Sequence, residues 1–481
     1  MSATDAGQLR KGAIGLPQVV FQSVTHMAPA AAVAFSLYAS VTFAGPALPL
    51  AVLLALIACV LAASCIGQLA KEVPSAGGLY AYVAKGLGPA PGFFVGWGYL
   101  LFQPLVAPLL FLIFAWVMGD LMTAEEHGFG ASNSLWWLWV ILAAGIVFLL
   151  TYRDVRLSTK AGVWLGVIEI VVFLALALWM IVSNLGDLTL QTLNPAHNPV
   201  AGIEGTFKGM IFAVLAFIGF EASAPLAEEA KDPRRTIPRA VVGSALAIGL
   251  FYWIASYGWV LGTGFGSFTE TVTNAANPWK DLGVVFWGVG WVLIVFAILN
   301  SAIANANAGV NAATRVMFAL GRNGVLPSAF ARVHPEHKTP HIATIVVSGG
   351  GLVLALVMGV IWDPLTAFII IATAVTIVVI VMYILACIAC AVYYFTQKRS
   401  AFNPLLHGVF PLVATAVFTC GLYFQFFTGW FTLALPPYPT RIATWVALGW
   451  IVAGVLLAAY MSVKRRSVLE NAGNVFVDES S

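Results

Sequence analysis

Long apolar runs separated by short polar segments make up almost the whole chain. A helix needs about 20 predominantly apolar residues to cross a bilayer. We therefore predict an all-α membrane protein with twelve transmembrane helices. They are expected at residues 17–43, 47–70, 91–118, 134–152, 161–184, 208–226, 239–262, 283–308, 341–362, 364–394, 407–428 and 442–463.

The composition excludes most other classes of protein. Of the 481 residues, 60% are hydrophobic and 9% are charged, whereas soluble domains carry about 25% charged residues. All five cysteines lie in apolar runs. Cys387 and Cys390, one helical turn apart, are better explained as packing residues than as a redox or zinc pair. Because the sequence has no metal-binding cluster, nucleophile–base pairing or phosphate-binding loop, we expect neither an enzyme nor a cofactor.

Lysine and arginine gather on one side of the predicted bundle. With the N-terminus in the cytoplasm, all of the 23 basic residues except Lys208, Lys280 and Arg441 fall on the cytoplasmic side. The positive-inside rule then places both termini in the cytoplasm, with tails at 1–16 and 464–481, the second one disordered. This predicts a multi-pass protein of the plasma membrane, which in a bacterium is the inner membrane. Since the basic residues are spread over every inner loop, no nucleic-acid partner is expected.

Two of the predicted helices carry signals of interruption. Helix 1 contains Pro29, which cannot donate a backbone hydrogen bond and clashes with the preceding turn, so a break is expected near Met27 to Ala30. Helix 6 contains Gly219 followed by Glu221, a carboxylate inside an apolar run. Each of these helices opens a block of five spans. That pattern matches two inverted repeats whose first helices are unwound at the midplane, where secondary transporters bind substrates.

Three motifs resemble the amino acid–polyamine–organocation transporter superfamily, over essentially the whole chain. The first is Phe217-Ile218-Gly219-Phe220-Glu221, followed by Glu228-Glu229 and the charged stretch 231–239. The second is Glu72-Val73-Pro74-Ser75-Ala76-Gly77-Gly78-Leu79-Tyr80, after helix 2. The third is Arg315-Val316-Met317-Phe318-Ala319-Leu320-Gly321-Arg322-Asn323-Gly324-Val325-Leu326-Pro327, after helix 8.

The resemblance implies a fold of the leucine-transporter type. It divides the chain into a first inverted repeat at 17–207, a second at 208–394, and two extra helices at 395–463. It also implies that helices 1 and 6, together with 3, 8 and 10, line a substrate site. Helix 1 departs from the glycine-rich break of many members and is similar to that of the bacterial putrescine-importer branch, which weakens the case for a standard α-amino acid as substrate.

Candidate substrate-binding residues follow from the two breaks and from polar positions in helices 3 and 8. Amides at the start of a half-helix can bind a carboxylate, and freed carbonyl groups can bind an ammonium group. The aromatic residues beside the helix 6 break can close over a substrate or are packing residues, and the helix 8 residues can instead bond other helices. The candidates are Met27, Ala28, Ala30, Ala31, Gln103, Phe217, Ile218, Gly219, Phe220, Asn300 and Ser301.

Three further residues are candidates for coupling or gating. Glu169 in helix 5 can carry a proton or ligate a cation, or it is a protonated group bonded between helices. Glu221 matches an acidic residue of the family with a gating role, or it caps the second half of helix 6. His26 can titrate near physiological pH or is a packing residue.

These observations predict a permease that moves an amino acid or related small amine by alternating access. Proton coupling through Glu169 is favoured, with sodium as the second choice. Two carboxylates at membrane depth, Glu169 and Glu221, are few for a polyamine, so a neutral or zwitterionic substrate is favoured. An ion-independent exchanger and a polyamine importer stay open, and a channel is disfavoured because no span has a repeating polar stripe. The sequence does not define the substrate, the coupling ion or the oligomeric state.

Overall fold

The computed structural model describes residues 14–464 except 76, 154, 200–201, 228, 323–325, 335–336, 338 and 430–431. The predicted tails at 1–16 and 464–481 therefore lie almost wholly outside the described residues. So do Glu228 and the Asn323–Val325 part of the third motif.

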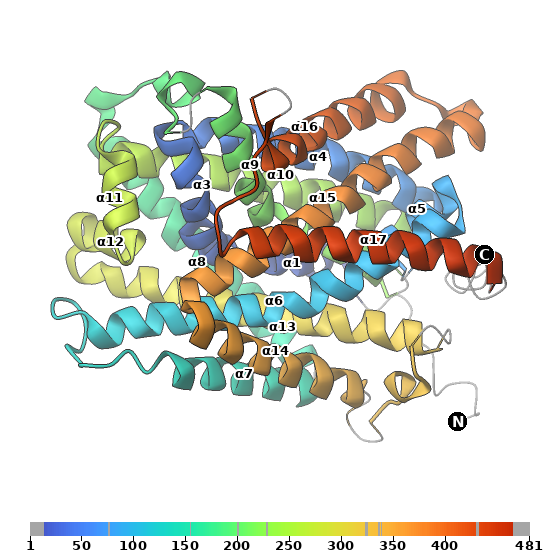
Figure 1. The fold of residues 1–481 in the computed structure, drawn as a ribbon, viewed down its shortest axis with the longest axis horizontal. Coiled ribbons are helices and arrows are strands. Elements are labelled where there is room, and N and C mark those ends of the chain that lie inside the picture. Colours follow the sequence, from blue (N-terminus) through green and yellow to red (C-terminus); the bar gives the residue numbers. More distant parts are fainter. Residues whose placement is uncertain are drawn as a thin grey trace.

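The described chain is a bundle of long helices, most of which run side by side (Figure 1). The α-helices are α1 (Leu16–His26), α2 (Pro29–Ala31), α3 (Leu37–Ala44), α4 (Leu48–Glu72), α5 (Leu79–Leu87), α6 (Pro89–Thr123), α7 (Trp136–Arg153), α8 (Val155–Ser183), α9 (Ile203–Phe217), α10 (Pro233–Thr263), α11 (Phe268–Asn274), α12 (Pro278–Trp287), α13 (Trp291–Arg322), α14 (His341–Trp362), α15 (Pro364–Thr396), α16 (Phe410–Phe426) and α17 (Arg441–Lys464). A two-residue strand pair, β1 (Phe427–Thr428) and β2 (Thr432–Leu433), follows α16.

Eleven segments of the described chain are long and apolar enough to cross a membrane. The first of them, Leu16–Glu72, contains the first two spans that the sequence predicts, with a turn of 3₁₀ helix at Gly45–Ala47 between α3 and α4. The chain is therefore a multi-pass helical membrane protein.

The predicted limits of helix 8, 283–308, are wrong at both ends. Residues 278–287 form the separate helix α12, and the long helix α13 begins only at Trp291 and continues to Arg322. The chain turns at Gly288, whose φ of +54° is accessible to glycine at little cost. Lys280 on α12 is buried, and its Nζ lies 2.6 Å from Asp120 Oδ2 near the end of α6, so this basic residue is an ion-pair partner and not a solvated loop charge.

The interruption of the first span lies at Met27 and Ala28. α1 ends at His26, Ala28 adopts φ +47° and ψ +65°, and α2 begins at Pro29. The proline ring disfavours the right-handed helical region for the preceding residue, so the helix does not continue through Ala28. The left-handed conformation that Ala28 adopts is uncommon for a residue other than glycine. The next five residues, Ala32–Ser36, form a π-helix before α3 begins.

The interruption of the sixth span lies at Ile218 and Gly219. α9 ends at Phe217, Gly219 has φ +119°, and the chain continues as a 3₁₀ helix, Phe220–Leu226. A side chain at Gly219 would collide with helix α1, because an added Cβ would lie 2.7 Å from His26 Cδ2. The glycine is therefore required both by the backbone angle and by the contact between the two interruptions.

A pair of tryptophans joins α17 to α6. Trp97 on α6 and Trp450 on α17 stack with ring centroids 4.3 Å apart. Each indole N–H donates to the backbone carbonyl of the other residue, at 2.9 and 3.0 Å. α17 crosses in front of α6 and α15 in Figure 1, and it contacts both.

Candidate functional site

Ser23 joins the two interrupted spans. Its hydroxyl donates to the Phe220 carbonyl at 2.7 Å and accepts from the Ser223 amide at 3.2 Å. These two backbone groups belong to the 3₁₀ segment that follows the break in the sixth span. One buried hydroxyl of α1 thus satisfies groups that an uninterrupted helix would have paired internally.

Tyr252 on α10 lies within hydrogen-bond distance of both interruptions. Its hydroxyl oxygen lies 2.8 Å from the Met27 carbonyl and 2.9 Å from the Ala216 carbonyl. In a continuous helix these carbonyls would accept from residues four positions further along the chain. A buried carbonyl without a donor is costly, so this tyrosine stabilises the broken conformation of both spans.

Glu221 is held within the break and tied to α15. Its Oε2 accepts from the Gly219 amide at 3.1 Å and from the Tyr383 hydroxyl at 2.7 Å. The side chain is 2% exposed. The carboxyl group therefore caps a backbone group at the interruption and also contacts a second span.

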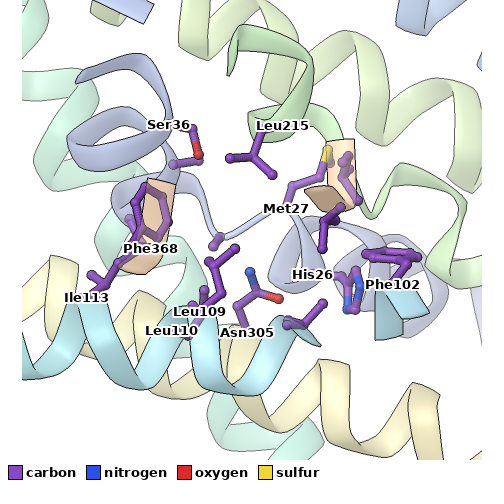
Figure 2. A pocket seen from close by; sticks show the side chains of 16 residues that line it. His26, Met27, Ser36, Phe102, Leu109, Leu110, Ile113, Leu215, Asn305 and Phe368 are labelled. Carbon is purple, nitrogen blue, oxygen red and sulfur yellow. The ribbon is translucent and has the colours of Figure 1, made fainter. Parts of the chain in front are cut away.

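A small cavity of about 50 Å³ lies beside the two interruptions. In Figure 2, His26 and Phe102 lie at one end, and Ile113 and Phe368 lie at the other. Most of the wall is apolar, and the polar side chains that line it are His26, Ser36 and Asn305. No aspartate or glutamate lines it among the described residues. It is bounded by the first span, α6, α9, α13 and α15, which correspond to predicted helices 1, 3, 6, 8 and 10.

Some of the residues predicted to bind the substrate line this cavity. Met27, Ala28, Ala31 and Ile218 line it, and so does His26, which was a coupling candidate. The other substrate candidates lie outside its lining: Ala30, Gln103, Phe217, Gly219, Phe220, Asn300 and Ser301. Glu169 and Glu221 also lie outside the lining.

Two of the aromatic candidates are engaged in packing. The rings of Phe217 and Tyr252 pack edge to face with their centroids 5.4 Å apart. The rings of Phe220 and Tyr383 are tilted to each other, with their centroids 5.0 Å apart. Both phenylalanines are 0% exposed. They hold the break against its neighbours and do not close over the cavity in this conformation.

Glu169 lies between α8 and α13. Its Oε2 accepts from the Asn300 side-chain amide at 3.2 Å, and the carboxyl group is 2% exposed. Asn300 was a substrate candidate, and here it is the partner of the coupling candidate. The described residues include no cation paired with Glu169.

Two polar side chains that line the cavity have hydrogen-bonding atoms without a partner among the described residues. Both ring nitrogens of His26 and the side-chain oxygen of Asn305 are buried and make no hydrogen bond within the described residues. Buried polar atoms are almost always hydrogen-bonded, so unpaired ones at a cavity wall are suited to a polar ligand. The first amides of α2, at Ala30 and Ala31, add helix N-terminal donors near the same wall.

Sequence reasoning missed most of the apolar wall and the residues that support the breaks. Phe102, Leu109 and Phe368 line the cavity, but in apolar spans they have no distinguishing signal. Asn305 belongs to the polar face of helix 8 and could have been added on that basis. Ser23, Tyr252 and Tyr383 are isolated polar groups in apolar runs, and such groups seek partners when buried. A search for them would have drawn attention to these three.

The fold and the site define a polytopic helical membrane protein with a cavity at two broken spans. The chain belongs to the amino acid permease family, whose model matches residues 18–471. This confirms the resemblance to the amino acid–polyamine–organocation superfamily. The family consists of permeases and not of enzymes.

The chain is similar to several curated transporters. It is 28% identical over 313 residues to the low-affinity putrescine importer PlaP of Escherichia coli K12, covering 62% of this chain and 65% of the importer. It is 27% identical over 329 residues to the branched-chain amino acid permease BcaP of Bacillus subtilis 168, covering 63% and 65%. It is 28% identical over 397 residues to the D-serine/D-alanine/glycine transporter of E. coli K12, covering 78% and 79%.

These relatives support a common class and not a common substrate. The matched segment spans 65% of the length of both the putrescine importer and the branched-chain permease. The named substrates range from a diamine to small and branched-chain amino acids.

Proposed function

We propose that this protein is a secondary active transporter that moves an amino acid or a related small amine across the membrane by alternating access. The observation that carries the proposal is the cavity at the meeting point of the two interrupted spans. Its lining combines helix-end backbone groups with unpaired polar side chains. In transporters with broken helices, such a site binds the polar ends of the substrate.

The proposed architecture is the five-plus-five inverted repeat of the leucine-transporter type. The first repeat would occupy 17–207 and the second 208–394, with two further helices at 395–463. The eleven candidate spans of the described residues are compatible with twelve if Leu16–Glu72 is counted as two, and an even number would leave both termini on the same side. The distribution of basic residues favours the cytoplasm for that side and the bacterial inner membrane as the location.

The favoured substrate is neutral or zwitterionic. A carboxylate would approach the amides of Ala30 and Ala31, while Leu109, Ile113 and Phe368 offer an apolar surface to a short side chain. A polyamine carries at least two positive charges and would need carboxylates, none of which lines the cavity among the described residues. The similarity to a putrescine importer keeps the polyamine alternative open to test.

The conformation of the cavity fits an occluded step of the transport cycle. A volume of about 50 Å³ holds only a few water molecules. A bound amino acid would therefore require the walls to move apart. In the proposed cycle, substrate binding widens this space, and one side of the bundle then opens.

Proton coupling through Glu169 is the favoured driving mechanism, with sodium as the second choice. The buried carboxyl group bonds Asn300 on α13, and α13 also supplies Asn305 to the cavity. A change in the charge of Glu169 would thus act on a helix that contacts the substrate. The alternative is ion-independent exchange, which requires no proton- or sodium-binding carboxyl group.

Liposomes containing the purified protein test the proposal. We expect saturable uptake of a neutral amino acid that shows counterflow and is driven by an inward proton gradient. Flux that does not saturate and shows no counterflow would indicate a channel and contradict the proposal. Counterflow without a response to proton or sodium gradients would identify the exchanger.

A thermal-shift screen on the same preparation tests the substrate class. A ligand that binds only the folded protein raises its melting temperature. We expect stabilisation by a small neutral amino acid and none by putrescine. Stabilisation by putrescine alone would favour the polyamine importer.

A further inference from the structure

A groove lined by cationic side chains lies between α4 and α10, at the end where α4 stops and α10 begins. It has a volume of about 600 Å³. Lys71 from α4 and Arg234, Arg235 and Arg239 from α10 line it, and Gln68 adds a polar side chain. No acidic residue lines the groove in the part of the chain that the structure describes.

The four cations are poorly compensated by the acidic residues that the structure describes. Arg235 Nε lies 3.6 Å from Asp232 Oδ2, but the two side chains are 75% and 56% exposed. Water screens such an exposed ion pair, so Asp232 neutralises the charge of Arg235 only weakly. The Lys71 ammonium group donates to the neutral Gln68 oxygen at 3.2 Å. Among the described residues, Arg234 and Arg239 form no ion pair. Neighbouring like charges repel, so an anion in the groove would relieve this repulsion.

Beyond the groove, α10 presents an exposed apolar stripe and α4 presents an exposed isoleucine. On α10, Arg239, Gly243, Leu246 and Leu250 follow at steps of four, three and four residues and so share one face. Leu246 and Leu250 are 45% and 43% exposed, and Ile57 on α4 is 40% exposed. In a helix that crosses a bilayer, such residues face lipid acyl chains.

The packing of the two helices leaves this path open. A Cβ at Gly67 would lie 3.5 Å from Pro238, so the helices are in close contact there. A Cβ at Gly243 would meet nothing within 4 Å. The wall of the groove is therefore closed beneath the cations and open toward the apolar stripe.

We propose that this groove binds an anionic phospholipid, with the phosphate among Lys71, Arg234, Arg235 and Arg239 and an acyl chain along Leu246 and Leu250. Arginine forms paired hydrogen bonds with phosphate oxygens, and basic pockets between membrane helices suit lipid headgroups. A soluble phosphate would use the cations but not the apolar stripe. The inference depends on the helices crossing a bilayer and not on the transported substrate.

The test measures lipid binding to the purified full-length protein without substrate. Phosphatidylglycerol and phosphatidylcholine with identical acyl chains are titrated into the detergent-solubilised protein. The melting temperature of the protein is recorded, and the bound lipid is measured by native mass spectrometry. We expect phosphatidylglycerol to raise the melting temperature and to be retained, and phosphatidylcholine to do neither. Equal effects of the two lipids would overturn the proposal.

Two variants act on different parts of the proposed site. The triple variant Arg234→Gln/Arg235→Gln/Arg239→Gln removes charge, and we expect it to weaken phosphatidylglycerol binding by at least about tenfold. Gly243→Trp keeps all four cations but fills the groove, and we expect a comparable loss. Gly349→Trp on α14, where an added Cβ also meets nothing, is the matched control and should bind as the native protein does.

Competition with inorganic phosphate identifies the source of the anion. We expect millimolar phosphate to leave phosphatidylglycerol bound, because it cannot replace the acyl-chain contacts. Full displacement would make this a free-anion site and overturn the lipid assignment. Phosphatidylglycerol binding at the native affinity by Gly243→Trp would also overturn the lipid assignment. Because that variant keeps all four cations, it remains informative even if the triple variant does not fold.

Discussion

At the scale of single residues, the site is organised by polar groups placed between spans rather than by groups that face the cavity. Ser23, Tyr252 and Glu221 each bond backbone atoms of an interruption. Glu169 bonds a side chain of another span. Their buried positions make each bond valuable, because a lost partner leaves a polar atom without water.

The first prediction concerns Glu169. Glu169→Gln keeps the size of the side chain but removes its capacity to exchange a proton, so we expect gradient-driven uptake to fall to background while substrate exchange persists. Uptake and counterflow in liposomes measure the two activities. Glu125→Gln, in an exposed loop, is the control. Concentrative uptake at the native level by Glu169→Gln would remove this residue from the coupling mechanism.

The second prediction concerns Tyr252. One hydroxyl proton can be donated to only one carbonyl at a time, so the Met27 and Ala216 carbonyls share a single donor. Tyr252→Phe removes that donor and should cost about 1–3 kcal/mol of folding free energy. Thermal denaturation in detergent measures the loss, with Tyr460→Phe on the exposed face of α17 as control. Equal stability of the two variants would show that water satisfies the carbonyls.

At the scale of elements, the interruptions depend on local backbone rules that the sequence displays. Pro29 prevents the helix from continuing through Ala28, and Gly219 has an angle that other residues rarely adopt. The two breaks then pack directly against each other, at His26 and Gly219. Each interruption is therefore stabilised by the other as well as by its own sequence.

The third prediction tests that contact. In Gly219→Ala, the new Cβ would lie 2.7 Å from His26 Cδ2 and 2.8 Å from its backbone carbon, at φ +119°. We expect a loss of at least about 1–3 kcal/mol from backbone strain alone, and a loss of uptake. Gly349→Ala, where the added methyl group meets nothing, should be neutral. Native stability and uptake in Gly219→Ala would mean that the breaks do not pack in this way in the membrane.

Sequence patterns predicted the elements better than the cavity, for physical reasons. A span is determined by length and apolarity, which are visible in the sequence, and each predicted range falls mainly in a helix. The exception is helix 8, where Gly288 and Gly290 divide an apolar run that shows no change in hydrophobicity. Leu109 and Ile113 line the cavity, but their residue type suits a lipid-facing or packed position equally well. Which face of α6 meets the breaks is decided by tertiary packing.

At the scale of the whole molecule, ion pairs join distant segments on the side that we propose to be cytoplasmic. A guanidinium nitrogen of Arg315 on α13 lies 3.3 Å from Oε1 of Glu229, which follows the sixth span. Glu72 at the end of α4 pairs with Lys398 after α15. The Ile14 backbone also bonds Glu229 and Lys231. Together these contacts join the ends of α4 and α13 and the segments after the sixth span and after α15 to their neighbours, and we expect them to favour a closed state on this side.

The fourth prediction tests this closure. Arg315→Glu should favour opening on that side by about two- to fivefold, since partly exposed pairs contribute up to about 1 kcal/mol. The alkylation rate of a cysteine introduced by Ser36→Cys, in a background in which all five native cysteines are replaced, measures access to the cavity. The exchange Arg315→Glu/Glu229→Arg should restore the native rate. An identical increase in Arg332→Glu, an exposed position with no ion pair among the described residues, would show that the effect is not specific to the pair.

The paired tryptophans have a consequence for how the protein is made. α6 supplies a large part of the cavity wall, and its Trp97 is fastened to Trp450 on the last helix. The two tryptophans lie 353 positions apart in the sequence, so a ribosome makes Trp450 long after Trp97. During translation α6 therefore lacks this support until α17 has been synthesised. Premature termination between α16 and Trp450 would leave α6 in place without this support for the wall of the site.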